Sequence, residues 1–342
     1  PAELAAIAGV LAERRRGTFQ VVPRIGERDG ADRASSRAEM AWMEQVSRDS
    51  GRPLAFSILQ SDRRPGLWKW VMDEVAAARG RGADVRPMTS VRGSAILYGL
   101  VARTPYDALP GWAELMARPF AARLEALADP ELRRRLAEEA ARPVQQSGPL
   151  APKDPAKLYL MPPGPAEYDV SADNSLAAEA ARRGTTPPAA LLDFLLETGG
   201  RGLLYYPVLN QDLDAVAEMI TNPDVVVGVA DAGAHVALTM DAGNSTFFLK
   251  HWVRDEGLLD VGRAVRKLTL EGADLFGLPG RGVLAPGAFA DINVLDLENL
   301  DLFTPEMVDD LPLGAHRFVQ RARGYDYTIV NGRVLVEHDE LT

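Results

Sequence analysis

A carboxylate and a histidine follow a strongly apolar segment in the second half of the chain. Residues 225–230 read Val-Val-Val-Gly-Val-Ala, Asp231 follows directly, and three small residues separate it from His235. The apolar run predicts a buried strand, and in a parallel α/β barrel the reacting groups gather where the strands end. A carboxylate there can bind a divalent cation, or take a proton from an attacking water and pass it to a departing nitrogen. Asp231 is therefore the predicted catalytic acid and metal ligand, with a turn or helix cap as the structural alternative.

Three further side chains are candidates for the same site. His235 could orient the carboxylate of Asp231 or contact a substrate, and the alternative is a loop histidine bonded to backbone. A substrate that carries a carboxylate can be held by a guanidinium through two parallel hydrogen bonds. Arg24 and Arg92 each follow a predicted strand. They are the candidate substrate-binding residues, with a solvated or helix-capping arginine as the alternative.

The segment after this loop has the pattern of an amphipathic helix. Asn244 or Ser245 is expected to cap its start. His251 precedes Asp255 by one helical turn, so we expect a structural ion pair between them.

These residues must be positioned by helices and strands that alternate along most of the chain. Almost fully apolar strands between amphipathic helices are typical of a parallel sheet covered by helices. The predicted helices span 3–14, 39–50, 68–78, 187–198, 212–220 and 261–276, and the predicted strands span 18–22, 53–59, 83–89, 157–161, 202–208 and 225–230. Two charged helices at 112–128 and 130–141 interrupt the alternation. We therefore predict an α/β fold in which residues 1–278 form part of a TIM-like (β/α)8 barrel, with a helical insertion at about 105–143.

The end of the chain has a different character. Residues 282–287 and 290–296 have the pattern of strands linked by turns. Asn331 and Gly332 tolerate positive φ and stand between two further strand-like segments, which favours a type I′ hairpin. Residues 279–342 are therefore predicted to form a small β module.

Composition restricts the classes of partner. The 342 residues include no apolar stretch near the roughly 20 residues that cross a bilayer, so no membrane partner is expected. A formal net charge of -10 makes nucleic acid an unfavourable partner. The chain has no cysteine, which excludes disulfides and thiolate metal sites and is compatible with the cytoplasmic location that we expect.

Three short motifs carry a family resemblance: Ala-Asp-Ala-Gly-Ala-His at 230–235, Leu-Lys-His-Trp-Val-Arg-Asp-Glu-Gly-Leu at 249–258 and Lys-Leu-Thr at 267–269. With the block at 280–296 and the Val-Asn-Gly hairpin, they resemble the N-acyl-D-amino-acid deacylase (D-aminoacylase) branch of the amidohydrolase superfamily. The resemblance implies a barrel of the amidohydrolase type beside a C-terminal β-sandwich. It also implies metal-dependent hydrolysis of the amide bond of an N-acyl amino acid, with Asp231 as metal ligand and proton carrier. Zinc is the implied cofactor, because the family site mixes histidine and carboxylate ligands.

The histidines depart from that family. Related deacylases begin with a His-x-His pair on the first barrel strand, and no such pair exists among the chain's histidines, which are His235, His251, His316 and His338. Where relatives place histidines after two middle strands, this chain has Val-Pro-Arg at 22–24 and Ser-Ile-Leu-Gln at 57–60. We therefore expect a C-terminal portion of an amidohydrolase that is inactive as an isolated fragment.

Two alternatives stay open at this point. One is a catalytically silent barrel fragment or subunit that binds a small molecule or a partner chain, which the absent histidines suggest. The other is a cyclic-amide hydrolase of the dihydropyrimidinase or imidase type, which would use the same machinery. The expected partners are a small-molecule substrate and either a second copy in a homo-oligomer or a chain that supplies the missing N-terminal strands.

Overall fold

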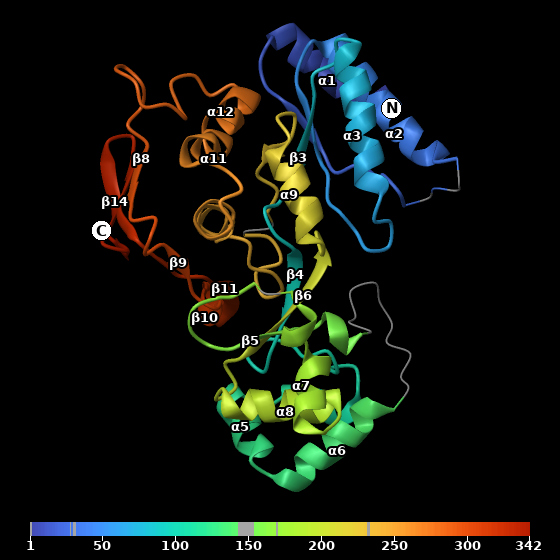
Figure 1. Cartoon of the computed structure of the whole chain (residues 1–342), viewed down its shortest axis with the longest axis vertical. Helices are drawn as coiled ribbons and strands as arrows, with labels where there is room; N and C mark the ends of the chain where they lie inside the picture. The colour runs from blue at the N-terminus through green and yellow to red at the C-terminus, as the bar shows by residue number, and fades with distance from the viewer. Residues whose placement is uncertain (1, 28, 30–31, 143–153, 169, 231–232) are drawn as a thin grey trace.

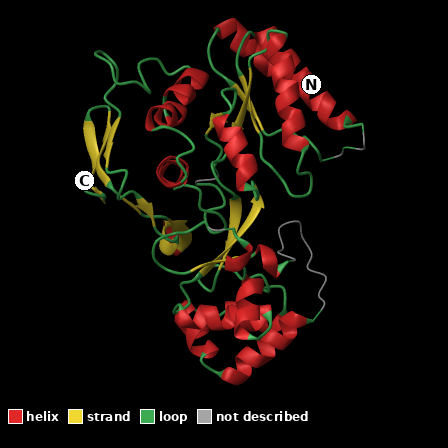
Figure 2. Cartoon of the chain, in the orientation of Figure 1, coloured by secondary structure: helices red, strands yellow, loops and turns green. Residues whose placement is uncertain are grey.

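Two large hydrophobic cores organise the molecule. The computed structural model describes residues 2–27, 29, 32–142, 154–168, 170–230 and 233–342. One core lies between a parallel sheet and its helices and extends toward the C-terminal strands, and the second belongs to a helical module at the opposite end (Figure 1). Figure 2 shows that strands in the middle of the molecule connect these two regions.

A parallel sheet with the strand order β1-β2-β3-β7 forms the first region. Its strands are β1 (Phe19–Val21), β2 (Leu54–Ser57), β3 (Val85–Thr89) and β7 (Val226–Val227). Leu54, Ala55 and Phe56 of β2 are fully buried, as expected for a central strand that is covered on both faces. The parallel strands predicted for these four segments are confirmed in shorter form. Within the described residues the sheet stays open, and its closure into a barrel is not observed.

Helices pack around this sheet. They are α1 (Ala2–Arg14), α2 (Ala34–Ser50), α3 (Leu67–Gly80), α9 (Leu213–Thr221), α11 (Val261–Leu268) and α12 (Leu270–Phe276). The carboxylate of Asp212 caps α9, and that of Asp260 caps α11. The single helix predicted over 261–276 is two helices, because Thr269 has φ -125° and ψ -80°. None of the helices in the described segments combines the length and apolar character that a membrane crossing requires.

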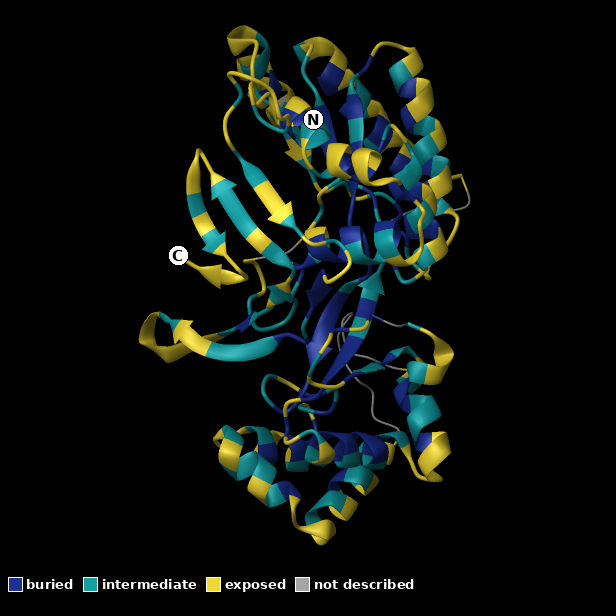
Figure 3. Ribbon diagram, turned by 60° about the vertical axis from the view of Figure 1, so that its left-hand side comes forward, coloured by how far each residue is buried: buried dark blue, intermediate teal, exposed yellow. Residues whose placement is uncertain are grey.

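An antiparallel sheet lies in the middle of the molecule. Its strands, in the order β4-β6-β5, are β4 (Ser94–Tyr98), β6 (Leu203–Leu209) and β5 (Tyr159–Met161). Figure 3 shows this sheet as largely buried. The expectation that segments 157–161 and 202–208 continue the parallel alternation was wrong, since both pair antiparallel. An apolar run indicates a buried strand, but it does not state the strand's direction.

The helical module has its own core. It contains α4 (Pro110–Met116), α5 (Phe120–Leu127), α6 (Pro130–Ala141), α7 (Leu176–Arg183) and α8 (Pro187–Glu197), with short 3₁₀ turns at Pro155–Lys157 and Ala172–Asn174. Trp112 is fully buried, and its Nε1 donates to the carbonyl of Leu136 at 3.1 Å. The helix predicted over 112–128 is interrupted because Pro119 lacks an amide hydrogen and disfavours helical geometry in the residue before it.

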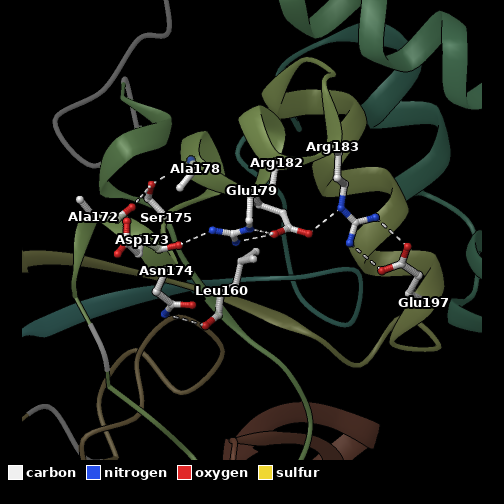
Figure 4. A network of polar contacts seen from close by, with 10 residues as sticks. All are labelled: Leu160, Ala172, Asp173, Asn174, Ser175, Ala178, Glu179, Arg182, Arg183 and Glu197. Carbon is white, nitrogen blue, oxygen red and sulfur yellow. Dashed lines mark hydrogen bonds and ion pairs between the residues drawn. The ribbon is translucent and has the colours of Figure 1, made fainter.

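Charged side chains fasten two helices of this module to each other (Figure 4). Glu179 on α7 accepts hydrogen bonds from Arg182 and Arg183. Arg183 also reaches Glu197 of α8 with two parallel contacts of 2.6 and 2.8 Å. The hydrogen bond from Arg183 is the main reason that the pKa of Glu179 is lowered. Nearby, the side-chain amide of Asn174 donates to the Leu160 carbonyl of β5 at 3.2 Å, which joins the helices to the sheet.

Short antiparallel strands end the chain. The main sheet consists of β15 (Glu340–Leu341), β14 (Arg333–Glu337), β13 (Tyr325–Val330) and β8 (Ile292–Leu295), and two smaller pairs join β9 (Asp301–Leu302) to β12 (Ala322–Arg323) and β10 (Glu306–Leu311) to β11 (Ala315–Val319). Asn331 (φ 50°) and Gly332 (φ 78°) form the predicted hairpin. Residues 282–287 contain no strand, contrary to expectation.

The antiparallel sheet β15-β14-β13-β8 is only partly covered by other parts of the molecule. None of its strand residues is buried, and Figure 3 shows the exposed positions. Leu295 and Tyr325 of this sheet pack against the first core, and the β-sandwich stays a prediction. The division of the chain at residue 278 stays a prediction.

Candidate active site

The ends of β3 and β7 border a small pocket of about 270 Å³. It is lined by Ser90 and Val91 after β3, residues 227–230 at the end of β7, the group Asp241, Ala242, Asn244 and Ser245, and Leu268. The amides of Gly228 and Val229 both donate to the Thr89 carbonyl, at 3.1 and 3.3 Å. These bonds tie the backbone that leads toward residue 231 to the end of β3. Ligands of parallel α/β folds bind at this edge of the sheet.

Asp231, the predicted catalytic acid and metal ligand, lies outside the described residues. Ala230, directly before it, lines the pocket. His235 is exposed, has a φ of 49°, and is not among the residues that line this pocket. Its carbonyl accepts hydrogen bonds from the amides of Leu238 and Thr239, at 2.7 and 3.2 Å. The roles assigned to Asp231 and His235 stay predictions.

Arg92 is enclosed behind the pocket. Its side chain is 2% exposed, and Nη1 lies 3.5 Å from Oδ1 of the equally buried Asp241. Nη2 donates to the Met240 carbonyl at 2.7 Å, and Nη1 donates to the Gly93 carbonyl at 3.3 Å. The guanidinium carbon lies 3.9 Å from the centre of the Tyr168 ring. These contacts hold the segment at 240–241, which contributes Asp241 to the pocket.

The surroundings of Arg92 also determine its charge. Burial alone lowers the pKa of this guanidinium, but Tyr168, Tyr205 and Asp241 together raise it above the ordinary value. Arg92 therefore stays protonated. Both of its terminal nitrogens are engaged by the protein, so its predicted role as a clasp for a substrate carboxylate stays without direct support.

Arg24, the other candidate clasp, lies apart from the pocket. Arg24 is exposed, and its backbone amide donates a long hydrogen bond of 3.5 Å to Oε2 of Glu39. It is absent from the pocket lining. A substrate-binding role for Arg24 stays a prediction.

Asn244 brings a polar side chain into the pocket. Its Nδ2 donates to Oγ of Ser90 at 3.2 Å, and its Oδ1 is a buried atom without a hydrogen-bond partner among the described residues. The expectation that Asn244 or Ser245 caps the helix was wrong, because the cap position of α10 (Asn244–Phe247) is Gly243 and no side chain caps it. Ser90 and Asp241 were not singled out from the sequence, and Asn244 was named there only as a helix cap, because no motif relates these three residues.

Hydrogen bonds fix the loop that follows β2. The Gln60 amide donates to Oδ1 of Asn210 at 2.8 Å, and the Asn210 amide donates to the Gln60 carbonyl at 2.7 Å. The side-chain carbonyl of Gln60 accepts from the Asp212 amide at 3.1 Å, and its Nε2 donates to Asp62 at 3.1 Å. Gln60, the last residue of the segment 57–60 in which related deacylases are expected to carry a histidine, is thus used in a structural network.

His251 does not form the expected ion pair. It lies in the π-helical segment Phe248–Asp255, and its ring stacks on Phe247 with 4.8 Å between centroids. Asp255 instead pairs with Arg254 at 2.7 Å. Burial lowers the pKa of His251, which favours its neutral form in this aromatic environment.

The described residues do not make a metal centre by themselves. Within the ranges that the structure describes, no group of three or more His, Asp or Glu side chains is arranged to hold a metal ion. In the loop after β1, Arg24 is exposed, and in the loop after β2, Gln60 is hydrogen-bonded within the protein. The predicted zinc therefore has no ligand set in this part of the chain.

Comparisons with known proteins place these features in a family. The model of the amidohydrolase family matches residues 1–336. A D-aminoacylase from Alcaligenes xylosoxydans xylosoxydans is 37% identical over 94 residues, which are 28% of this chain and 18% of that protein. A dihydroorotase from Elusimicrobium minutum is 33% identical over 86 residues, which are 25% of this chain and 20% of that protein.

Solved structures share the fold. A crystal structure of D-aminoacylase aligns with a TM-score of 0.52 and 19% identity, over 99% of this chain and 57% of that one. The N-acyl-D-glutamate deacylase of Bordetella bronchiseptica, solved with zinc and a phosphonate inhibitor, aligns with a TM-score of 0.51 and 21% identity, over 98% of this chain and 56% of that one. The chain thus spans less than two thirds of the length of these proteins.

Proposed function

Since the chain belongs to the amidohydrolase family, we propose that it forms part of an enzyme that hydrolyses the C–N bond of a small amide. The proposed substrate class is an N-acyl amino acid, because a D-aminoacylase and an N-acyl-D-glutamate deacylase are among the proteins it resembles. The observation that carries the proposal is the pocket between the ends of β3 and β7. Residues 228–230 line this pocket, and Asp231 follows them directly in the sequence.

Asp231 has the central role in the proposed reaction. Its carboxylate would take a proton from the water that attacks the amide carbonyl and deliver a proton to the nitrogen as the C–N bond breaks. Asn244 and Ser90, which line the same pocket, could orient the amide through hydrogen bonds. Arg92 would act indirectly: it would hold in place the segment that carries Asp241.

The proposed hydrolysis requires a metal ion. The Bordetella bronchiseptica deacylase was solved with zinc, and zinc is the ion to be expected in a complete centre. Because the described residues supply no three-ligand set, at least one ligand would have to come from outside them, and Asp231 is the one proposed. A second copy or another chain that completes the site belongs to the same proposal.

Hydrolysis assays on matched variants test this function. The natural gene product that contains this sequence is compared with its Asp231→Asn variant and with Asp73→Asn, which changes an exposed carboxylate on α3. Release of free amine from N-acetyl-D-amino acids should fall about 10²- to 10⁴-fold in Asp231→Asn, the usual contribution of general acid–base catalysis. It should be unchanged in Asp73→Asn. Undiminished hydrolysis by Asp231→Asn would remove the proposed acid.

The chain expressed alone provides a second measurement. We expect it to bind no stoichiometric metal and to show little or no turnover, because its described residues offer no complete ligand set. Rapid turnover by the isolated chain would contradict this expectation. If the natural gene product also lacks both metal and hydrolysis, the catalytically silent binding role replaces the enzymatic one.

A cyclic amide is the second candidate substrate. The observation in its favour is the 33% identity with a dihydroorotase over 86 residues. Dihydroorotate and hydantoin are therefore included in the assay. Their hydrolysis in place of N-acetyl-D-amino acids would assign the cyclic-amide reaction to the same pocket.

A further inference from the structure

A second, larger cavity lies between the helical module and the β10–β11 hairpin. Its volume is about 620 Å³, more than twice that of the pocket beside β3 and β7. Val101, Phe120, Arg123 and Arg201 line it from the helical side, and residues of β10 and β11 line it from the other side. The size is within the range of cavities that hold small molecules. None of its lining residues belongs to the proposed active site.

One part of this cavity is apolar. Phe120 and Phe303 are only partly buried, and Met307 adds an adaptable side chain. The ring of Phe120 packs against the backbone of Gly200, where an added Cβ would lie 3.0 Å from the ring. Gly200 has a φ of 75°, so this close approach depends on glycine. The turn at Gly200 thereby places an aromatic ring beside Arg201.

The other part carries the positive charges of Arg123 and Arg201. The side chain of Arg123 is fixed by two bonds of 2.7 Å, from Nε to the Arg118 carbonyl and from Nη1 to the Leu100 carbonyl. Carbonyl acceptors orient a guanidinium without cancelling its charge. The charge of Asp107 acts on Arg123, whereas no carboxylate among the described residues forms an ion pair with Arg201. Burial lowers the pKa of Arg123, the charge of Asp107 opposes this in part, and a bound anion would oppose it further.

The hairpin side differs in its charges. Arg321 is paired with Glu306 at 2.9 Å, so this guanidinium is already occupied. Asp309 is exposed and lines the cavity. A bound anion would therefore be attracted by Arg123 and Arg201 and repelled by Asp309.

We propose that this cavity is a binding site for a small organic carboxylate with an aromatic or apolar body. Phe120 and Phe303 would contact the body, and Arg201, which lines the same cavity as the fixed guanidinium of Arg123, would hold the carboxylate. A guanidinium and a carboxylate form short, charge-assisted hydrogen bonds, and aromatic walls add apolar contact. The site is independent of the proposed hydrolysis.

Isothermal titration calorimetry with three matched probes tests the site. 3-Phenylpropionate has both the ring and the carboxylate, acetate lacks the ring, and 3-phenylpropan-1-ol lacks the charge. We expect saturable binding of 3-phenylpropionate, and at least tenfold weaker binding of the other two. Equal affinity for the alcohol, or no saturable binding of the acid, would overturn the proposal.

Two variants with opposite expected effects locate the binding. Arg201→Gln removes an exposed guanidinium and should weaken binding about tenfold, the usual size of a hydrogen bond to a charged group. Asp309→Asn removes the repelling carboxylate and should tighten binding about twofold. Arg333→Gln, an exposed arginine on β14, is the control and should leave the affinity unchanged. Binding that neither Arg201→Gln nor Asp309→Asn alters lies elsewhere and refutes the assignment.

Discussion

Replacing Arg92 by methionine tests whether this residue holds the wall of the proposed active site. The change removes hydrogen bonds to the Met240 and Gly93 carbonyls and the ion pair with Asp241. Both charged side chains are 2% exposed, so Asp241 would be left as a buried charge without its guanidinium. Breaking a buried ion pair by removing one partner costs about 3–5 kcal/mol. We expect Arg92→Met to lower the free energy of unfolding by this amount.

Urea unfolding followed by tryptophan fluorescence measures the effect. Trp252 is a local reporter, since its Nε1 donates to the Val91 carbonyl at 2.8 Å. The double variant Arg92→Met/Asp241→Asn also removes the buried negative charge of residue 241 and should recover part of the lost stability. Arg333→Met is the control for an exposed arginine and should change stability by about 0.5 kcal/mol or less. A loss under about 1 kcal/mol in Arg92→Met, or no recovery in the double variant, would refute the reasoning.

Two further predictions concern other parts of the chain. Burial alone raises the pKa of Asp301, but Lys250, the Leu302 amide and Arg323 together outweigh it and lower the pKa below its ordinary value of 3.8. The resulting stabilisation is complete above pH 3.8 and is lost as the pH falls through the folded-state pKa. Thermal unfolding should therefore show that Asp301→Asn is less stable than the wild type near neutral pH. In strong acid the two proteins should be nearly equal in stability. Gly282→Ala should cost about 2 kcal/mol in urea unfolding, because residue 282 has a φ of 77° and the new Cβ would lie 2.8 Å from the Leu270 backbone; an unchanged midpoint would contradict this.

Hydrophobic patterning predicted where the strands lie, but not which sheet they join. The parallel neighbours β1, β2, β3 and β7 follow from apolar runs that alternate with helices. The runs that became β5 and β6 are equally apolar and pair antiparallel with β4. Alternate residues of β6 belong to different cores, Leu204 to that of the helical module and Leu203 and Tyr205 to the other, and this division is not visible in the apolar run. The Asn331-Gly332 hairpin was predictable because its geometry depends on two adjacent residues.

The candidate site was predictable only where its signal is local. The small-residue loop after β7 indicated the edge at which the pocket lies, since Ala230 lines it. Arg92 looked like a substrate clasp because a residue's position after a strand does not reveal its burial, and the structure encloses it between Asp241 and Tyr168. His251 was expected to pair with Asp255 from helical spacing alone, whereas the π-helical segment places its ring on Phe247. Tertiary contacts decided each of these outcomes.

The helical module is joined to the edge of the parallel sheet through Asn210, at the end of β6. Asn210 has a φ of 52°, and its side chain both accepts from the Gln60 amide and donates to the Ser90 carbonyl at 3.1 Å. The loops after β2 and β3 are therefore fixed by the strand that returns from the module. Gln60 could turn toward a metal or substrate only by giving up its bonds to Asp62 and Asp212. The Ser90 segment, which lines the pocket beside β3 and β7, is therefore held in part by a hydrogen bond from the strand that returns from the module.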